Sequence, residues 1–204
     1  MGRRANTKFP PMKGDAYQTP FRPVPFLIPH LKNVRSFAEP CIGEGKLVRH
    51  LSRFGLRCTF AGDIQFGQDA LTCPNLPLVK YDAIITNPPW TRSVLHPMIE
   101  RFASIAPTWL LFDADWAYNS EISQYIDQCS HIVAVGRIKW IDGSEHTGKD
   151  NAAWYRFHDQ HSGGPRFIPR PVETDRFGFP LEAMDILNRR EEQAAADEPL
   201  MVAA

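Results

Sequence analysis

The chain has few cysteines, and their spacing excludes the common zinc-binding patterns. Four cysteines occur in 204 residues, with no Cys-x-x-Cys pair and no regularly spaced histidine partner; they are Cys41, Cys58, Cys73 and Cys129. We therefore expect no metal site. The first residues also lack the apolar run of a signal segment, so we expect a protein of the reducing cytoplasm without a membrane partner.

The chain has no excess of charge of either sign, because 23 lysines and arginines balance 23 acidic residues. This balance argues against a strongly electrostatic nucleic-acid binder as a whole. The distribution is uneven, with seven cations and one acid in residues 1–35 but two cations and six acids in residues 181–204. Residues 1–14 form a basic arm that either contacts phosphates or is merely solvated. Residues 186–204 form an acidic tail that we expect to be disordered by its end.

No internal repeat is visible, and predicted strands alternate with predicted helices. Apolar runs typical of strands occupy residues 34–39, 57–62, 81–86, 108–112, 131–136 and 151–157, and helical spacing occupies residues 46–51, 94–102 and 121–129. This alternation predicts one three-layer α/β domain over residues 15–185, with a Rossmann-like sheet. Such a chain has no room for a large separate DNA-reading domain, so target specificity would come from loops or from a partner.

The most informative segment follows the strand at residues 81–86 and reads Asn87, Pro88, Pro89, Trp90. The exocyclic amino group of a nucleobase is a poor nucleophile, because its lone pair is delocalised into the ring. The Asn87 carboxamide oxygen and the Pro88 carbonyl can accept hydrogen bonds from that amino group and localise the lone pair. The prolines stiffen the turn, and Trp90 offers a flat face to an extruded base. The alternative is a strand-ending turn whose tryptophan packs in the core.

A glycine turn lies upstream, between the strand at residues 34–39 and the helical segment at residues 46–51. Gly43 and Gly45 let the backbone approach a ligand closely, and the next helix N-terminus directs amide hydrogens toward a ligand carboxylate. The following strand ends at Asp63, about 20 residues on, the spacing at which a βαβ unit places an acid on ribose hydroxyls. An acid at Asp69 can accept a hydrogen bond from an adenine amino group.

Together these motifs resemble the class I S-adenosylmethionine-dependent methyltransferases, and among them the small phage-type adenine-N6 DNA methyltransferases. The family's motif of an acid followed by Pro-x-x-Gly-x-Gly corresponds to residues 39–45, and its Tyr-x-Thr-Pro motif corresponds to residues 17–20. The resemblance covers residues 15–160. It implies a seven-stranded, mostly parallel sheet with a terminal antiparallel hairpin, and S-adenosylmethionine as cofactor.

The resemblance also implies individual roles. Glu39 would hold the methionine ammonium, Asp63 the ribose and Asp69 the adenine of the cofactor. The implied cofactor site comprises Tyr17, Thr19, Pro20, Glu39, Pro40, Gly43, Gly45, Asp63, Asp69 and Ala70. The residues at 17–20 could instead form only a turn before the Pro-rich stretch.

The loop between the last two predicted strands mixes cations, an aromatic residue and glycines. Such a loop can contact phosphates and wedge beside a base, and the alternative is a polar hairpin loop with its tryptophan in the core. We expect nucleic-acid contacts from Arg92, Lys139, Trp140, His146 and Lys149. Two arginines in the Pro-rich residues 163–171 are secondary candidates for contacts with the nucleic-acid backbone.

We therefore expect methyl transfer to the N6 amino group of adenine in DNA. Cytosine is the close competitor, but relatives that act there more often carry serine where this chain has Asn87. The same turn occurs in enzymes that methylate adenine in RNA or a glutamine amide in a protein. A non-catalytic cofactor-binding or nucleic-acid-binding protein of this fold is the alternative of a different class, against which the intact set of motifs argues.

Overall fold

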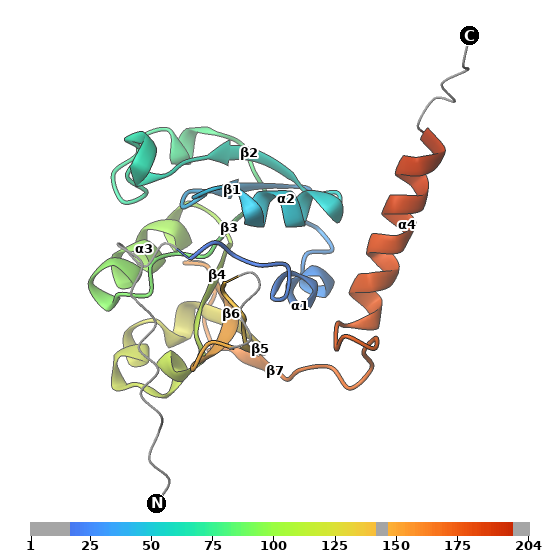
Figure 1. Cartoon of the computed structure of the whole chain (residues 1–204). Coiled ribbons are helices and arrows are strands. Elements are labelled where there is room, and N and C mark those ends of the chain that lie inside the picture. The colour runs from blue at the N-terminus through green and yellow to red at the C-terminus, as the bar shows by residue number, and fades with distance from the viewer. Residues whose placement is uncertain (1–16, 142–146, 198–204) are drawn as a thin grey trace, which may run out of the picture.

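The computed structural model describes residues 17–141 and 147–197. Its centre is one seven-stranded sheet with the strand order β2-β1-β3-β4-β6-β5-β7. Neighbouring strands are parallel except at β6, which runs antiparallel to both β4 and β5. Six strands therefore point one way, which confirms the predicted Rossmann-like, mostly parallel sheet (Figure 1).

Six of the seven strands lie close to the apolar runs of the sequence, and β7 (Arg166–Ile168) has no such run. The other six are β1 (Ser36–Glu39), β2 (Arg57–Ala61), β3 (Ala83–Thr86), β4 (Thr108–Asp113), β5 (Cys129–Arg137) and β6 (Asn151–Phe157). The α-helices are α1 (Val24–Leu27), α2 (Lys46–Arg53), α3 (Arg92–Ile105) and α4 (Leu181–Asp197). Short 3₁₀ turns occupy η1 (Ile28–His30), η2 (Ile64–Phe66), η3 (Leu76–Leu78), η4 (Ala114–Tyr118), η5 (Ser120–Gln124) and η6 (Ile126–Gln128).

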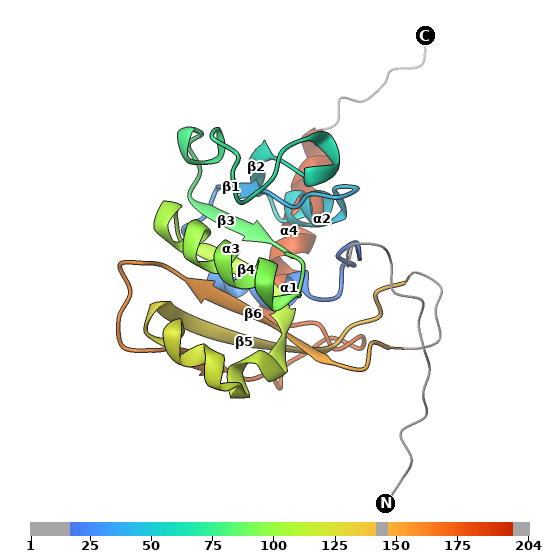
Figure 2. The ribbon, with the colours of Figure 1, turned by 90° about the vertical axis from the view of Figure 1, so that its left-hand side faces the viewer.

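Helices cover both faces of the sheet and give three layers. One face carries α1, α2 and α4, and the other carries α3 and the turns between β4 and β5 (Figures 1 and 2). Side chains alternate between these faces along each strand. In β4, Trp109 and Leu111 pack toward α1, α2 and α4, whereas Leu110 and Phe112 pack toward α3. Each face of the sheet thus has its own apolar core.

The predicted β5–β6 hairpin is present, and β7 adds a further strand beyond it. β7 pairs in parallel with β5, with His131 opposite Arg166. It belongs to the Pro-rich segment that the sequence indicates as a surface strap, and Pro165 and Pro169 bracket its three residues. Proline is tolerated there because an edge strand needs hydrogen-bond donors on only one side.

One segment differs from its predicted secondary structure. The helix expected over residues 121–129 is instead the pair of 3₁₀ turns η5 and η6, closed by short-range bonds such as Tyr125 N–H to the Ile122 carbonyl at 2.8 Å. The first part of the acidic tail, expected to be disordered only by its end, is helical as far as Asp197 and belongs to α4. Ala183 and Leu187 are buried against the core beneath α1 and α2, so tertiary packing stabilises this helix.

We expect Phe112→Ala to lower the free energy of unfolding by about 3–5 kcal/mol, because it leaves a cavity in the core under α3. The Phe112 ring is fully buried, stacks on Tyr155 at 4.1 Å between centroids and meets Trp116 edge-on at 5.2 Å. Urea unfolding measures the loss. Phe177→Ala is the matched control, since that ring is 62% exposed, and an equal loss in both variants would contradict the assigned core.

Candidate active site

A cavity of about 350 Å³ opens where the first three strands end. Glu39 ends β1, Asp63 follows β2 and Asn87 follows β3, and all three line this cavity. Parallel strands bring their carboxyl ends to one edge of a sheet, where ligands bind in α/β folds. The lining includes eight residues expected at a cofactor, Tyr17, Thr19, Glu39, Pro40, Gly43, Asp63, Asp69 and Ala70, together with Asn87 and Pro89 of the turn. Pro20, Gly45, Pro88 and Trp90 lie outside the lining.

Glu39 places a buried carboxyl group in the cavity wall. The residue is 1% exposed, and its Oε1 accepts hydrogen bonds from the Thr86 hydroxyl and from the Cys41 backbone N–H, the latter at 3.0 Å. Its Oε2 is buried and has no hydrogen-bond partner among the described residues. Desolvation by burial raises the pKa of Glu39 to about 8. A cationic ligand group in the cavity would complete the hydrogen bonding of Oε2 and favour the charged carboxylate.

Asp63 ties two loops of the cavity together. Its Oδ2 accepts from the Gly43 N–H at 2.8 Å, and its Oδ1 accepts from the Gln65 N–H at 2.9 Å, which caps η2. Gly43 has a φ of +51°, and a Cβ there would lie 2.2 Å from Gln18 Nε2. Gln18 Oε1 in turn accepts from the Glu44 N–H at 2.9 Å. The glycine turn is thus fixed from both sides by side chains, as the predicted close approach requires.

Asp69 and the first turns of α3 complete the wall. Asp69 Oδ1 accepts from the Leu71 N–H at 2.9 Å, which fixes the carboxylate beside Ala70. Val94 and Met98, one helical turn apart on α3, add an apolar surface opposite. The cavity therefore combines carboxylates with an apolar wall, which suits a ligand that has a flat ring and several polar groups.

The Asn-Pro-Pro-Trp turn is held in one orientation by two hydrogen bonds. Asn87 Nδ2 donates to the Tyr17 carbonyl at 3.3 Å, and Asn87 Oδ1 accepts from the Trp90 indole N–H at 3.2 Å. That N–H also lies 3.2 Å from the Leu111 carbonyl. Because one end of the carboxamide faces an acceptor and the other a donor, its oxygen cannot exchange places with its nitrogen without losing both bonds. Trp90 therefore orients Asn87, a role that the sequence motif alone does not indicate.

Trp140 of the predicted nucleic-acid loop lies beside this turn. Its ring meets the Trp90 ring edge-on at 5.5 Å between centroids and lies 6.4 Å from the Tyr17 ring. Trp140 is partly buried, whereas Lys139 and Lys149 are exposed on the same loop. His146, the fourth predicted contact of this loop, lies outside the described residues. The structure thus brings two exposed cations and a half-buried aromatic ring to the edge where Asn87 lies.

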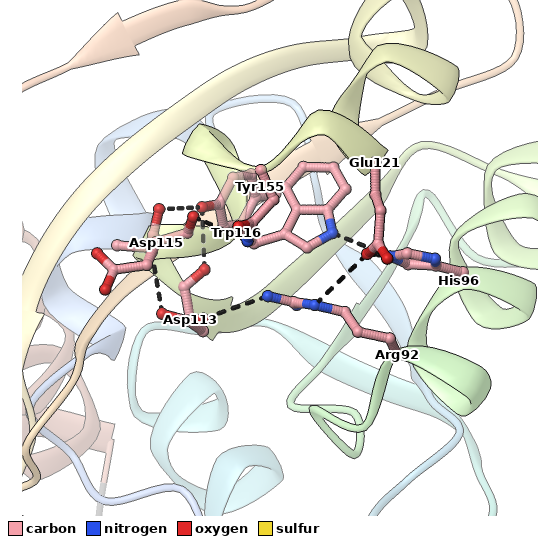
Figure 3. A network of polar contacts seen from close by, with 9 residues as sticks. Arg92, His96, Asp113, Asp115, Trp116, Glu121 and Tyr155 are labelled. Carbon is pink, nitrogen blue, oxygen red and sulfur yellow. Dashed lines mark hydrogen bonds and ion pairs between the residues drawn. The ribbon is translucent and has the colours of Figure 1, made fainter.

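Arg92, also predicted to contact nucleic acid, belongs to a network of polar groups at the ends of β4 and α3 (Figure 3). Its Nη2 lies 3.3 Å from Asp113 Oδ2, and its Nε lies 4.0 Å from Glu121 Oε2. His96 in the same network accepts from the Trp116 N–H at 3.1 Å and lies 3.7 Å from Glu121. A guanidinium beside two carboxylates has little net charge left for a phosphate, so a nucleic-acid contact by Arg92 stays a prediction.

Three residues of the site escape the motif analysis, and each had a signal in the sequence. Thr86 is a polar residue that ends the apolar run of β3, and it is fully buried where it donates to Glu39. Gln18 lies inside the Tyr-x-Thr-Pro motif. Met98 follows Val94 at helical spacing, so the sequence predicts the apolar face of α3. The position of that face over the cavity depends on tertiary packing.

The cysteines and the other possible ligands add no metal chemistry to the described part of the chain. Burial raises the pKa of the Cys41 thiol, which disfavours a reactive thiolate next to Glu39. Within residues 17–141 and 147–197, no three histidine, cysteine or acidic side chains gather as a metal site. None of the helices described there combines the length and the apolar character that crossing a bilayer requires.

No family model and no curated protein matches the chain. Solved structures match at low identity. A Listeria monocytogenes protein, described as a proposed class I S-adenosylmethionine-dependent methyltransferase, is 11% identical over 81% of this chain and 68% of its own, with a TM-score of 0.46. The precorrin-6y C5,15-methyltransferase of Geobacter metallireducens is 12% identical over 67% and 87%, with a TM-score of 0.38.

A dimethyladenosine transferase of Plasmodium falciparum is likewise 12% identical, over 70% of this chain and 62% of that chain, with a TM-score of 0.38. These similarities concern the arrangement of the sheet and its helices. They carry no information on the chemistry of the site.

We expect Glu39→Gln to change how stability depends on pH. The carboxyl pKa is about 8 in the folded chain against an ordinary value of 4.5, so the folded state holds a proton that the unfolded state releases between these values. The corresponding stability is fully present below pH 4.5 and is lost as the pH rises through about 8. Urea unfolding over this range should show a steeper fall for the wild type than for Glu39→Gln.

The matched control is Glu44→Gln, which removes an exposed glutamate from the same glycine turn. This control should keep the wild-type pH dependence. If Glu39→Gln also kept it, Glu39 would be ionised throughout this range and the assigned burial of its carboxyl group would be wrong.

Proposed function

We propose that this chain binds S-adenosylmethionine in the cavity at the ends of β1, β2 and β3 and transfers its methyl group to the N6 amino group of adenine in DNA. The observation that carries the proposal is the buried, unpartnered Glu39 Oε2 in the same cavity as Asn87. The first group suits the ammonium of the cofactor, and the second suits the amino group that accepts the methyl. A binding protein without catalysis would need only the first.

The side chains that line the cavity match the polar groups of this cofactor one by one. Glu39 would pair with the ammonium, Asp63 with the ribose hydroxyls, and Asp69 with the adenine amino group, while the Gly43 turn allows close approach. The volume of about 350 Å³ falls within the range of pockets that bind small molecules, roughly 300–1,000 Å³. When bound, S-adenosylmethionine supplies an electrophilic methyl group and takes up the electron pair of the broken carbon–sulfur bond.

The residues of the turn prepare the acceptor nitrogen. Asn87 Oδ1 and the Pro88 carbonyl would accept hydrogen bonds from the target amino group, which localises its lone pair toward the cavity. The Asn87 oxygen already accepts from Trp90 and keeps a second lone pair for the target. The amino group loses one proton to solvent after methylation, so no base catalyst is needed.

Adenine in DNA is favoured by the Asn-Pro-Pro-Trp turn, through its resemblance to adenine-N6 enzymes, and by the exposed Lys139 and Lys149 of the loop whose Trp140 contacts Trp90. A target in a duplex would have to leave the base stack to reach Asn87. The rings of Trp90 and Trp140 are partly buried and meet edge-on, so their exposed parts would pack against an extruded base, and the two lysines would contact the phosphates that flank it.

The proposal is tested by calorimetry and by a labelled-methyl assay. We expect saturable binding of S-adenosylmethionine to the wild type, and about ten- to a hundred-fold weaker binding to Glu39→Gln, because a hydrogen bond to a charged group is lost. Labelled cofactor is then offered with DNA, RNA and protein, and the methylated nucleosides are identified by mass. Absence of cofactor binding would overturn the whole proposal, whereas methyl on cytosine, RNA or glutamine alone would overturn only the substrate.

We expect Asn87→Ala to lower turnover by about 10²–10³, because it removes an acceptor whose interaction strengthens in the transition state. Cofactor affinity should stay within about two-fold of the wild type, since Glu39, Asp63 and Asp69 are untouched. Single-turnover kinetics and calorimetry measure the two quantities. A large loss of cofactor affinity would show that Asn87 is a structural residue of the cavity.

Two variants, Trp90→Phe and Trp90→Ala, separate the two proposed roles of Trp90, which are stacking on the base and orienting Asn87. The phenyl ring keeps a stacking face but loses the N–H that orients Asn87, whereas alanine loses both. Stacking is worth about 1–3 kcal/mol per base. We expect a DNA target with a missing partner base, which is easier to extrude, to rescue part of the loss in Trp90→Ala but none of it in Trp90→Phe or Asn87→Ala. Equal rescue of all three variants would contradict these roles.

A further inference from the structure

A second cavity, of about 470 Å³, lies at the opposite edge of the sheet from the candidate active site. Its lining includes Ala83, which begins β3, and Pro107, which precedes β4, so it opens at the amino ends of the parallel strands. Arg156, near the end of the reversed strand β6, reaches the same edge. Neither the motifs of the sequence nor the proposed function assigns a role to this cavity.

The polar groups of this cavity are mainly cationic or can become so. They come from separate elements: His30 from η1, Lys32 from the loop after it, His131 from β5 and Arg156 from β6. The two imidazole rings flank the Trp109 ring, with centroid distances of 6.1 Å from His30 and 5.8 Å from His131, and lie 6.4 Å from each other. Arg166 on β7 pairs with His131 in the sheet and adds a charge at the rim.

Arg156 is a half-buried cation with no carboxylate partner among the described residues. Its Nη1 donates to Ser130 Oγ at 2.9 Å, and Ser130 Oγ also lies 3.0 Å from His131 Nδ1. Burial lowers the pKa of Arg156, and burial together with Arg156, His30, Arg166 and His161 lowers the pKa of His131. The groups that act electrostatically on His131 are all basic, and Arg156 lacks a neutralising carboxylate, so this part of the cavity favours an anion.

Among the described residues, Asp82 lines the cavity and Glu182 pairs with Lys32 at its side. Asp82 is exposed at the rim, and its Oδ2 accepts from the backbone N–H groups of Arg35 and Ser36, both at 2.8 Å, and from the Ser36 hydroxyl. Glu182 of α4 pairs with Lys32 at 3.3 Å and raises the pKa of His30, against the larger effect of burial. Neither acid neutralises Arg156 or His131.

We propose that this cavity binds a phosphate group, held by Arg156 and His131 with His30 and Lys32 at its sides. A tetrahedral dianion accepts several hydrogen bonds at once, which matches a guanidinium and two imidazoles that converge from different elements. Trp109 is 2% exposed, so the floor offers no stacking face for a base. The ligand is therefore recognised by its phosphate, whether free in solution or on a nucleic-acid chain.

Sulfate is the first probe, because its charge does not change between pH 5 and 8. In the full chain, sulfate should shift the imidazole NMR signals of His131 and His30 saturably, and it should bind more tightly as the pH falls, since protonated imidazoles add positive charge. Sodium chloride at equal ionic strength is the reference. Equal shifts with chloride, or shifts that do not saturate, would overturn the proposal.

Substitutions of single basic residues distinguish sulfate binding in this cavity from general screening of the surface charges. We expect Arg156→Gln to weaken sulfate binding at least ten-fold and Arg156→Lys to weaken it less, while Arg176→Gln, an exposed arginine outside the lining, should bind as the wild type does. If Arg156→Gln does not fold, His131→Gln provides the second measurement and should reduce the pH dependence to the part that His30 contributes. Unchanged binding in the folded variants would overturn the proposal.

Inorganic phosphate and a short DNA duplex then distinguish the two sources. Both are titrated while the signals of His131 are followed, and competition between DNA and sulfate identifies a nucleic-acid phosphate. Displacement by inorganic phosphate but not by DNA identifies a free phosphate compound. Failure of both to displace sulfate would overturn the assignment to phosphate, and none of these results bears on S-adenosylmethionine binding at the other edge of the sheet.

Discussion

The arrangement of the candidate active site depends on the hydrogen bonds of the buried Glu39 carboxyl group. A carboxyl group without solvent is costly unless its oxygens are hydrogen-bonded. Here one oxygen accepts hydrogen bonds from the Thr86 hydroxyl at the end of β3 and from the Cys41 N–H in the glycine turn. The other oxygen lines the cavity and has no hydrogen-bond partner among the described residues. The same group thus fixes the spacing of β1 and β3 and leaves a place that only a ligand or a proton can fill.

The Asn-Pro-Pro-Trp turn is likewise held by a few specific contacts. Asn87 is held from one side by the segment before α1, through the Tyr17 carbonyl, and from the other by its own turn, through Trp90. Trp90 in turn reaches the backbone of β4 at Leu111. The geometry of one carboxamide is therefore set by three segments that are far apart in the sequence, and movement of any of them would misdirect its oxygen.

The sequence predicted the mostly parallel sheet and the motif turns, but it mispredicted the helix at residues 121–129, and several tertiary contacts have no signal in it. The acid after each of the first two strands, the glycine turn and the Asn-Pro-Pro-Trp turn are short patterns whose spacing fixes their place, and the cavity gathers them as expected. The segment of β7 reads as a Pro-rich strap, because three residues carry no periodicity until β5 offers them an edge. Likewise α4 extends into a tail whose composition favours solvent, because Ala183 and Leu187 find a core that sequence spacing does not reveal. The pairing of Arg92 with Asp113 joins residues 21 positions apart and has no local signal.

The reversed strand β6 also determines the order in which the chain can complete its sheet. β6 lies between β4 and β5, although it follows both in the sequence. Until residues 151–157 have been synthesised, β4 has an open edge although β1, β2 and β3 are complete, and β5 has no neighbour in the sheet. An unpaired, apolar edge of this kind is a template for pairing with other chains. A nascent chain stalled before β6 would therefore contain every group proposed to bind the cofactor and yet be prone to aggregate.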